Sequence, residues 1–578
     1  EGLLWLVGDN VLGGAVTLNA GFLAVDGDQT VSEFGGLGGI LALCFCKTLT
    51  VDQSTDTAFA GEITGEGSLV KSGTGTLALT GNSSFFLGAT TVTGGTIAIG
   101  TDTSLGDADF AAVTLDGGAL RSGAAITVDN NVALGGSGGT WNTNGNDTTL
   151  SGDLTGVGAF TKTGSGTLTL TGNNSNSGGT TVSDGTLRAG IASAFVNNTA
   201  YVVDSGILDL NGFDLTMSSL SGAGGQVQLG AALLTVDQFT DTTFAGTIAG
   251  TGALQKSGTG TLTLSNTQAY TGITAVVDGT LQLTADNALA SSESVIVDPF
   301  ATLDIADTAQ TLNSLAVGPD GTVLLGAGTL TLESPTAGFA STLIGPVTGT
   351  GGLVVNGADT MVFIEGPQAY TGGTTINDGM VFLDVDDALS PGSALTLNGG
   401  FLFVDGDQTV SQFGGLGGVL DLCFCKTFTV DQSTDTTFAG EVSGDGSLVK
   451  TGTGTLALTF DNSFFFGATT VTGGTIALGT GTSLGSGDVT LDGGGLRSDA
   501  AITVDNNIEF GAGGGTWDTN GNDTTSSGDL TGAGAFIKAG AGTLVLQGTN
   551  SAFSGGTTVT GGVVALTAND SLGTGGVT

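Results

Sequence analysis

Apolar residues alternate with threonine along much of this chain. Residues 261–264 read Thr-Leu-Thr-Leu, and such alternation is typical of a strand with one buried face. Glycine and the pairs Asn-Gly and Asp-Gly separate these segments every few residues, as turns do. No run combines helical spacing with capping signals. The pattern therefore predicts an all-β chain of many short strands.

One short motif recurs six times, with the form Lys-x-Gly-x-Gly-Thr-Leu-x-Leu in its fullest copies. Its first positions are 91, 94, 100, 94 and 88 residues apart by subtraction, and a degenerate copy carries Asn356 there. A Gly-x-Thr or a close relative follows 16 or 17 residues later, usually two residues after an aromatic. The lysines that open the other five copies are Lys71, Lys162, Lys256, Lys450 and Lys538. A fixed period predicts a solenoid whose stacked coils bury one continuous core.

A longer repeat is superimposed on the first. Residues 21–101 match residues 400–480 at a constant offset of 379, so that 1–199 repeats as 380–578. We expect modules of about 94 residues in one continuous β-solenoid over 1–578, a single elongated rod with ~20–25 residues per coil. Both ends fall within a module. We therefore expect either a longer natural chain or an array that continues from one molecule to the next.

The fullest module joins four short motifs. They are Asn-Gly-Asn-Asp at 144–147, Gly-Asp-Leu-Thr-Gly at 152–156, the lysine motif at 162–170 and a Gly-Gly-Thr-Thr segment at 178–187. Together they resemble the autotransporter-associated β-strand repeat of bacterial passenger domains. The resemblance implies a right-handed parallel β-helix outside the cell, at the bacterial surface. It implies no particular ligand.

The charge of the chain limits its partners. Its net charge is -43, from 10 basic and 53 acidic residues. Nucleic acids and anionic membranes bind through lysine and arginine, so neither is an expected partner. No stretch approaches the ~20 apolar residues of a membrane helix, so we expect no membrane insertion in this segment. The acidity fits a soluble surface protein, and exposed carboxylates predict at most weak Ca²⁺ binding, with no metal site and no cofactor.

No enzyme chemistry is strongly indicated. The chain has 0 His, which excludes Ser-His-Asp triads and histidine-bound zinc. Some parallel β-helices cleave polysaccharides with paired carboxylates, but glycines beside the candidates indicate coil turns. We predict no catalytic residue and no enzyme activity. The carboxylates considered are Asp26, Asp28, Asp384, Asp386, Asp387, Asp405 and Asp407.

The cysteines occur as two Cys-Phe-Cys triplets, Cys44 with Cys46 and Cys423 with Cys425. On a strand, this spacing places both thiols on one face at ~6.6 Å between Cα atoms, so a bond within a pair is strained. Leu41, Leu43 and Phe45 are then expected to face the core. We predict cross-links between neighbouring molecules or coils, with free surface thiols as the alternative. For the motif lysines we expect a packed stem and an ammonium that reaches a neighbouring carboxylate.

Three functions are compatible with these patterns. The first is a structural rod that forms or decorates an extracellular fibre or sheath and assembles end to end with copies of itself. The second is an adhesin-like module that binds glycans, a host surface or other surface proteins through aromatics, the alternative being that these rings stack inside the solenoid. A polysaccharide-degrading enzyme is the least favoured. The aromatics considered are Phe85, Phe86, Phe464, Phe465 and Phe466.

Overall fold

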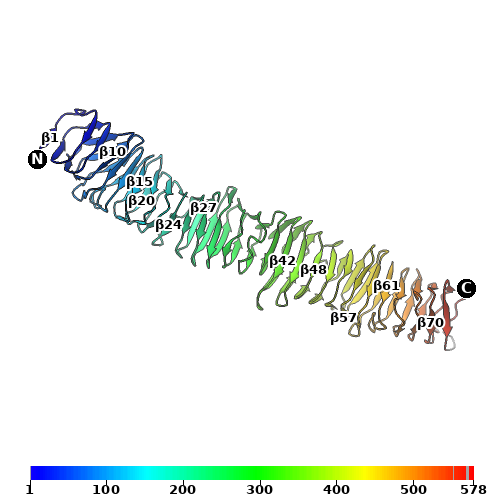
Figure 1. Ribbon diagram of the computed structural model, residues 1–578. Helices are drawn as coiled ribbons and strands as arrows, with labels where there is room; N and C mark the ends of the chain where they lie inside the picture. Colours follow the sequence, from blue (N-terminus) through cyan, green and yellow to red (C-terminus); the bar gives the residue numbers. More distant parts are fainter. Residues whose placement is uncertain (1, 551, 568–571) are drawn as a thin grey trace. The chain divides into compact units, whose positions relative to one another are not determined.

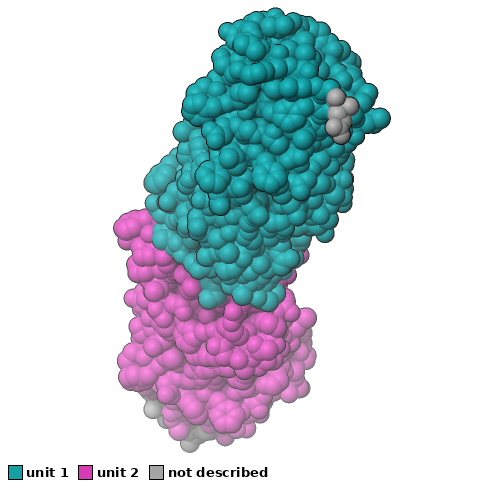
Figure 2. All heavy atoms as spheres, turned by 90° about the vertical axis from the view of Figure 1, so that its left-hand side faces the viewer, with its two compact units in different colours: residues 1–281 teal, residues 282–578 magenta. Residues whose placement is uncertain are grey.

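A computed structural model describes residues 2–550, 552–567 and 572–578. These ranges contain 72 strands and no helix, which confirms the all-β prediction (Figure 1). The chain divides into two compact units, Glu1–Leu281 and Gln282–Thr578 (Figure 2). Continuity of a single solenoid across that division stays a prediction, as does its handedness.

Each unit is a parallel β-solenoid in which successive coils stack strand on strand. In unit 1, β7 (Thr48–Asp52) pairs in parallel with β10 (Ser68–Ser72), and β10 pairs with β12 (Thr90–Val92). Leu49 is opposite Leu69, and Leu69 is opposite Thr90, so these coils take 20 and 21 residues by subtraction. The confirmed fold thus has the coil length that the sequence suggested.

One coil supplies strands to three sheets. The coil after β7 runs through β9 (Glu62–Gly65), β10 and β11 (Thr76–Leu79), and these three strands pair with different neighbours. Unit 2 repeats the arrangement. Its seven-stranded counterpart of the β10 sheet contains β52 (Gln408–Val410), β55 (Thr427–Asp431), β58 (Ser447–Thr451), β60 (Thr469–Val471), β62 (Val489–Leu491), β65 (Ile508–Phe510) and β68 (Leu530–Gly532).

The core of each unit is filled by the inward half of the alternating pattern. In β22 (Thr167–Leu170) both leucines are buried and both threonines lie on the outer side. The aromatic before each Gly-x-Thr is also inside: Phe86, Tyr270, Tyr370, Phe465 and Phe553 are all buried. Each of these aromatics buries a large apolar side chain in the core of its own coil. The outer side of most strands remains threonine-rich.

Candidate functional site

The five motif lysines occupy an inward position on their strands. Lys71, for example, is the fourth residue of β10 and is fully buried. The other four lysines are fully buried as well. In the degenerate copy the structurally equivalent residue is Val355, because Val355 pairs with Ile376 as Lys71 pairs with Val92. The sequence alignment had placed Asn356 there, one residue too far along.

Each lysine ammonium is bound by backbone carbonyls. Lys256 Nζ donates to Ser257 O at 2.8 Å and Gly258 O at 2.7 Å in its own turn, and to Asp278 O at 3.1 Å on the next coil. The same pattern holds at Lys162, with distances of 2.9, 2.7 and 3.1 Å. The expected contact with a carboxylate is therefore wrong. Carbonyls at a turn lose their strand partners, and the lysine supplies the missing donor.

Burial disfavours the charged form of these amines. It lowers the pKa of Lys162 and of Lys256 to about 8, while nearby aspartates act in the opposite direction. Burial also lowers the pKa of Lys71, Lys450 and Lys538. A buried, depressed lysine can be a reactive amine, but here all five ammonium groups donate to the backbone. Lys71, Lys162, Lys256 and Lys538 also bond to a carbonyl of the next coil and so tie two coils together.

The threonine of the same motif makes a second bond between coils. Thr76 N donates to Asp56 Oδ1 at 2.7 Å, one coil earlier. The other four lysine copies have the same bond at 2.7 or 2.8 Å, from Thr167 to Asp147, Thr261 to Asp241, Thr455 to Asp435 and Thr543 to Asp523. Accepting a backbone N–H lowers the pKa of Asp56, Asp435 and Asp523. Many acidic side chains are thus part of the coil-to-coil bonding.

The carboxylates considered for catalysis lie at coil turns. Asp28 Oδ1 accepts Thr48 N at 2.8 Å, and Asp407 Oδ1 accepts Thr427 N at 2.7 Å. Asp386 Oδ1 accepts Asp407 N at 2.8 Å and lies 3.7 Å from Lys426 Nζ. The remaining candidates are Asp26, Asp384, Asp387 and Asp405, on the same or adjacent turns. Turn positions held by backbone bonds fit the structural interpretation of these residues.

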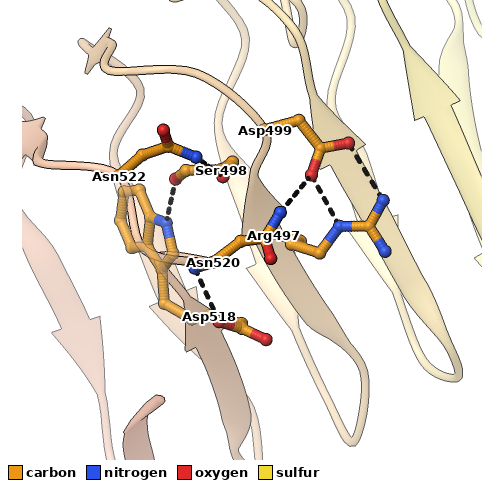
Figure 3. A network of polar contacts seen from close by, with 7 residues as sticks. Arg497, Ser498, Asp499, Asp518, Asn520 and Asn522 are labelled. Carbon is orange, nitrogen blue, oxygen red and sulfur yellow. Dashed lines mark hydrogen bonds and ion pairs between the residues drawn. The ribbon is translucent and has the colours of Figure 1, made fainter. Parts of the chain in front are cut away.

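Arg497 also belongs to a network of polar contacts that includes neighbouring coils. Arg497 forms a two-pronged ion pair with Asp499, with distances of 2.7 and 2.9 Å, and Asn520 donates to the same carboxylate at 3.1 Å (Figure 3). The hydrogen bond from Arg497 holds the pKa of Asp499 below its ordinary value. In the core, Trp517 Nε1 donates to Ser498 Oγ at 3.0 Å. This network links neighbouring coils on the outside and inside of one sheet.

The cysteine triplets lie in turns, after their strands have ended. β6 (Ile40–Leu43) stops before Cys44, and Lys47 N donates to Cys44 O at 3.1 Å, which closes a four-residue turn. Phe45 is 72% exposed and its copy Phe424 is 76% exposed. The expectation that Phe45 faces the core is therefore wrong, although Leu41 and Leu43 are buried as expected.

The thiols themselves are free in the structure. Cys44 and Cys423 are half-buried, and Cys46 and Cys425 are exposed. The chain has no further cysteine, so no partner is available on a neighbouring coil. Burial raises the pKa of Cys44 and Cys423, with nearby aspartates adding to it. A link between molecules stays a prediction.

The aromatics considered for adhesion separate into two groups. Phe86 and Phe465 are buried, so they cannot contact a ligand and that part of the prediction is wrong. Phe85, Phe464 and Phe466 are exposed beside them. Sequence reasoning missed a larger apolar surface on β46 (Met361–Ile364), β49 (Met380–Leu383) and β51 (Phe401–Val404). Its signal was present, because methionine and phenylalanine take the outward positions where other strands have threonine.

Within the described ranges, no group of three or more His, Cys, Asp or Glu side chains could hold a metal ion. Weak Ca²⁺ binding by surface carboxylates stays a prediction. No helix among those residues is long and apolar enough to span a membrane.

Comparison with known proteins identifies the repeat. The family described as the passenger-associated-transport-repeat matches six segments, residues 69–99, 160–189, 254–283, 347–381, 448–478 and 536–566. Each match begins in or next to the strand that carries the motif lysine or its replacement, and it ends about one coil later. Five of the six matches therefore contain a motif lysine together with the backbone carbonyls that it binds.

A curated relative extends the likeness to most of the chain. The chain is 32% identical over 557 residues to the Adhesin BmaC autotransporter of Brucella suis biovar 1 (strain 1330), which covers 87% of this chain and 15% of the relative. The chain thus spans a small part of that protein's length. No solved structure matches it. The repeats and the relative indicate a location outside the cell, at its surface. The chain thus contains six passenger-associated-transport repeats and is similar over most of its length to an autotransporter adhesin.

Proposed function

We propose that this segment is an adhesin-like part of a surface passenger, which acts without catalysis. It would serve as a scaffold that presents outward side chains to a partner. The observation that carries the proposal is the use of the polar motif residues. The lysines, the aspartates bound to motif threonines, and Asp28, Asp386 and Asp407 all bond to the backbone of their own or a neighbouring coil. A relative named as an adhesin supports the same role.

Competition with purified segment tests this role. Bacteria that produce the full protein are allowed to attach to host epithelial cells in the presence of increasing amounts of the purified chain. We expect saturable inhibition of attachment. An unrelated protein of similar size and net charge serves as the control and should leave attachment unchanged. Attachment that persists at every concentration of the purified chain would contradict the proposal.

Absence of enzyme activity is part of the proposal and has its own test. The purified chain is incubated with acidic and neutral polysaccharides, and new reducing ends or unsaturated products are measured. We expect no product above that of a variant with Asp28→Asn and Asp407→Asn. Product that the native chain makes and this variant does not would favour a carbohydrate-active enzyme instead.

Assembly into a fibre through the cysteines is a second candidate. Its support is the exposure of Cys46 and Cys425, at equivalent turns 379 residues apart. Two such thiols from different molecules would form one disulfide and pass two electrons and two protons to a disulfide oxidant. We expect multimers on non-reducing electrophoresis after treatment with oxidised glutathione, and none in a Cys46→Ser, Cys425→Ser variant. Monomer alone from the native chain would rule out this cross-link.

A further inference from the structure

Three neighbouring strands of unit 2 carry apolar residues on their outer side, where many other strands carry threonine. On β22 and β33 (Thr261–Leu264), the outward residues are threonines. On β46, β49 and β51 they are the six residues that we call the aromatic patch. The patch consists of Met361, Phe363, Met380, Phe382, Phe401 and Phe403. Neighbouring coils have Thr342 in register with Phe363 and Asp421 in register with Phe403, so this row of phenylalanines is three coils long.

The phenylalanines of the patch form a stack. The ring centroids of Phe363 and Phe382 are 4.7 Å apart with an interplanar angle of 11°, and those of Phe382 and Phe403 are 4.7 Å apart at 6°. Phe401 adjoins the stack, with its centroid 6.1 Å from that of Phe403. Strand register brings this about, since Phe363 pairs with Phe382 and Phe382 pairs with Phe403. Stacking therefore covers both faces of Phe382 and one face each of Phe363 and Phe403.

The fold does not require an aromatic ring at the position of Phe403. The near-identical first copy keeps Phe22 where the second has Phe401, but it has Ala24 where the second has Phe403. Both residues lie on equivalent strands, and β3 (Phe22–Val25) forms its parallel ladder with Ala24 in place. A half-exposed phenylalanine at a position where alanine suffices costs free energy, because it exposes additional apolar surface to water. An exposed apolar patch on a soluble protein is typical of an interaction site.

Carboxylates frame the patch on both sides. Asp359 and Asp378 lie in the turns just before β46 and β49. Glu365, Asp384 and Asp405 directly follow β46, β49 and β51, and all five carboxylate residues are exposed. Asp378 accepts the N–H of Gly379 at 2.8 Å. Burial and the neighbouring charge of Asp405 raise the pKa of Asp384, which shows that like charges meet along this edge.

Three kinds of occupant can be compared on this geometry. A sugar stacks on an open ring face, and the central ring of this patch, Phe382, has both faces covered by its neighbours. A second copy would bring the same carboxylates and a net charge of -43 against its own kind. A polypeptide with apolar residues at its centre and lysine or arginine toward both ends matches the patch and the carboxylates on both sides of it.

We propose that the aromatic patch is a docking surface for a cationic, amphipathic segment of a protein partner. The biological purpose of this docking surface rests on the proposed adhesive role. Binding of the partner segment can be measured on the purified chain without that assumption. The apolar centre supplies affinity and the flanking carboxylates supply orientation and fast association.

Peptide binding to the purified chain tests the proposal. The probes are an 18-residue peptide with leucines at its centre and lysines toward both ends, the same peptide with glutamates for lysines, and a third with serines for leucines. We expect the lysine–leucine peptide to bind at least tenfold more tightly than either of the others. Binding that depends on lysine alone, with the serine peptide equally tight, would overturn the proposal.

Variants locate the site. In a Phe363→Thr, Phe382→Thr, Phe403→Ala variant we expect the affinity for the lysine–leucine peptide to fall about tenfold, whereas Phe239→Thr, an exposed phenylalanine in unit 1, should leave it unchanged. Phe403→Ala alone copies Ala24, so it preserves the fold and should give part of the loss. Native affinity in both patch variants would refute the site. The proposal would also be refuted if the native chain self-associated or bound neutral oligosaccharides and the triple variant lost that property. Failure of the host-cell competition with intact peptide binding would count against the adhesive role alone.

Discussion

At the scale of single residues, the polar residues that recur in each repeat form hydrogen bonds with backbone groups. The motif lysine is buried and satisfies carbonyls of two successive coils, and the motif threonine donates its N–H to an aspartate of the coil before. Both bonds are made where the strand ladder is interrupted by a turn. They replace ladder bonds that the turn cannot make.

Loss of one lysine should therefore weaken its coil. We expect Lys256→Met to lower the free energy of unfolding by about 1–3 kcal/mol, because buried carbonyls lose their donor. Lys47→Met is the matched control, since Lys47 is only half-buried in a turn, and should change stability by less than ~0.5 kcal/mol. Urea denaturation followed by circular dichroism measures both. Equal effects from the two variants would contradict the role assigned to Lys256.

Because of the same lysines, the free energy of unfolding should change with pH in the alkaline range. Their pKa is lower in the folded chain, about 8 for Lys162 and Lys256, than the ordinary value of 10.5. Between those values the unfolded chain binds more protons, so the free energy of unfolding should rise with pH from about 8 to 10.5. Above pH 10 the buried tyrosines, whose pKa burial raises, should reverse the trend. Urea midpoints at constant ionic strength measure this, and a flat profile in native chain would contradict it.

The aspartates that accept the motif threonine N–H groups should affect stability at acidic pH. Accepting the N–H of Thr455 lowers the pKa of Asp435, so its contribution is present above pH 3.8 and is lost as pH falls through its lower, folded-state pKa. We expect Asp435→Ala to lower the thermal midpoint at pH 7. Asp435→Asn should retain most of the stability, because Asn131 and Asn507 accept the same kind of bond elsewhere. An Asn variant as unstable as the Ala variant would argue against a hydrogen-bonding role.

At the scale of the element, glycine sets how closely successive turns approach. Gly258, two residues after the motif lysine, has φ +70°, and a Cβ there would lie 2.4 Å from Gln238 O on the previous coil. Only glycine fits both conditions. The recurrence of this glycine in the motif therefore follows from turn-on-turn stacking.

Substitution at this glycine tests the stacking. We expect Gly258→Ala to reduce the free energy of unfolding by about 1–3 kcal/mol through steric overlap. Gly136→Ala, where no atom lies within 4 Å of the added Cβ, is the control and should be nearly neutral. Denaturation curves of the two variants provide the comparison, and tolerance of alanine at 258 would show that the turns are farther apart.

At the scale of the whole molecule, the sequence predicted the fold better than the chemistry. Alternation and period suffice for a parallel solenoid, because both follow directly from strand geometry. The partner of Lys256 could not be read from the sequence, since backbone carbonyls leave no residue signature. The position of Phe45 was missed because β6 ends three residues earlier than an unbroken alternation suggests. The aromatic patch was missed because it lies on coils that do not repeat it.

The central claim is that coils of about 20 residues stack in parallel, in register. Pairs of spin labels test it most directly. They are attached to cysteines introduced into a variant that lacks the four native ones, at the outward positions Thr409, Thr429 and Val449. These positions pair one after another across three coils. The account predicts Cα separations that grow by ~4.8 Å per coil, with strong dipolar broadening for 429 with 449 and weaker broadening for 409 with 449. Broadening that is absent from the 429–449 pair, or no weaker at 409–449, would contradict it.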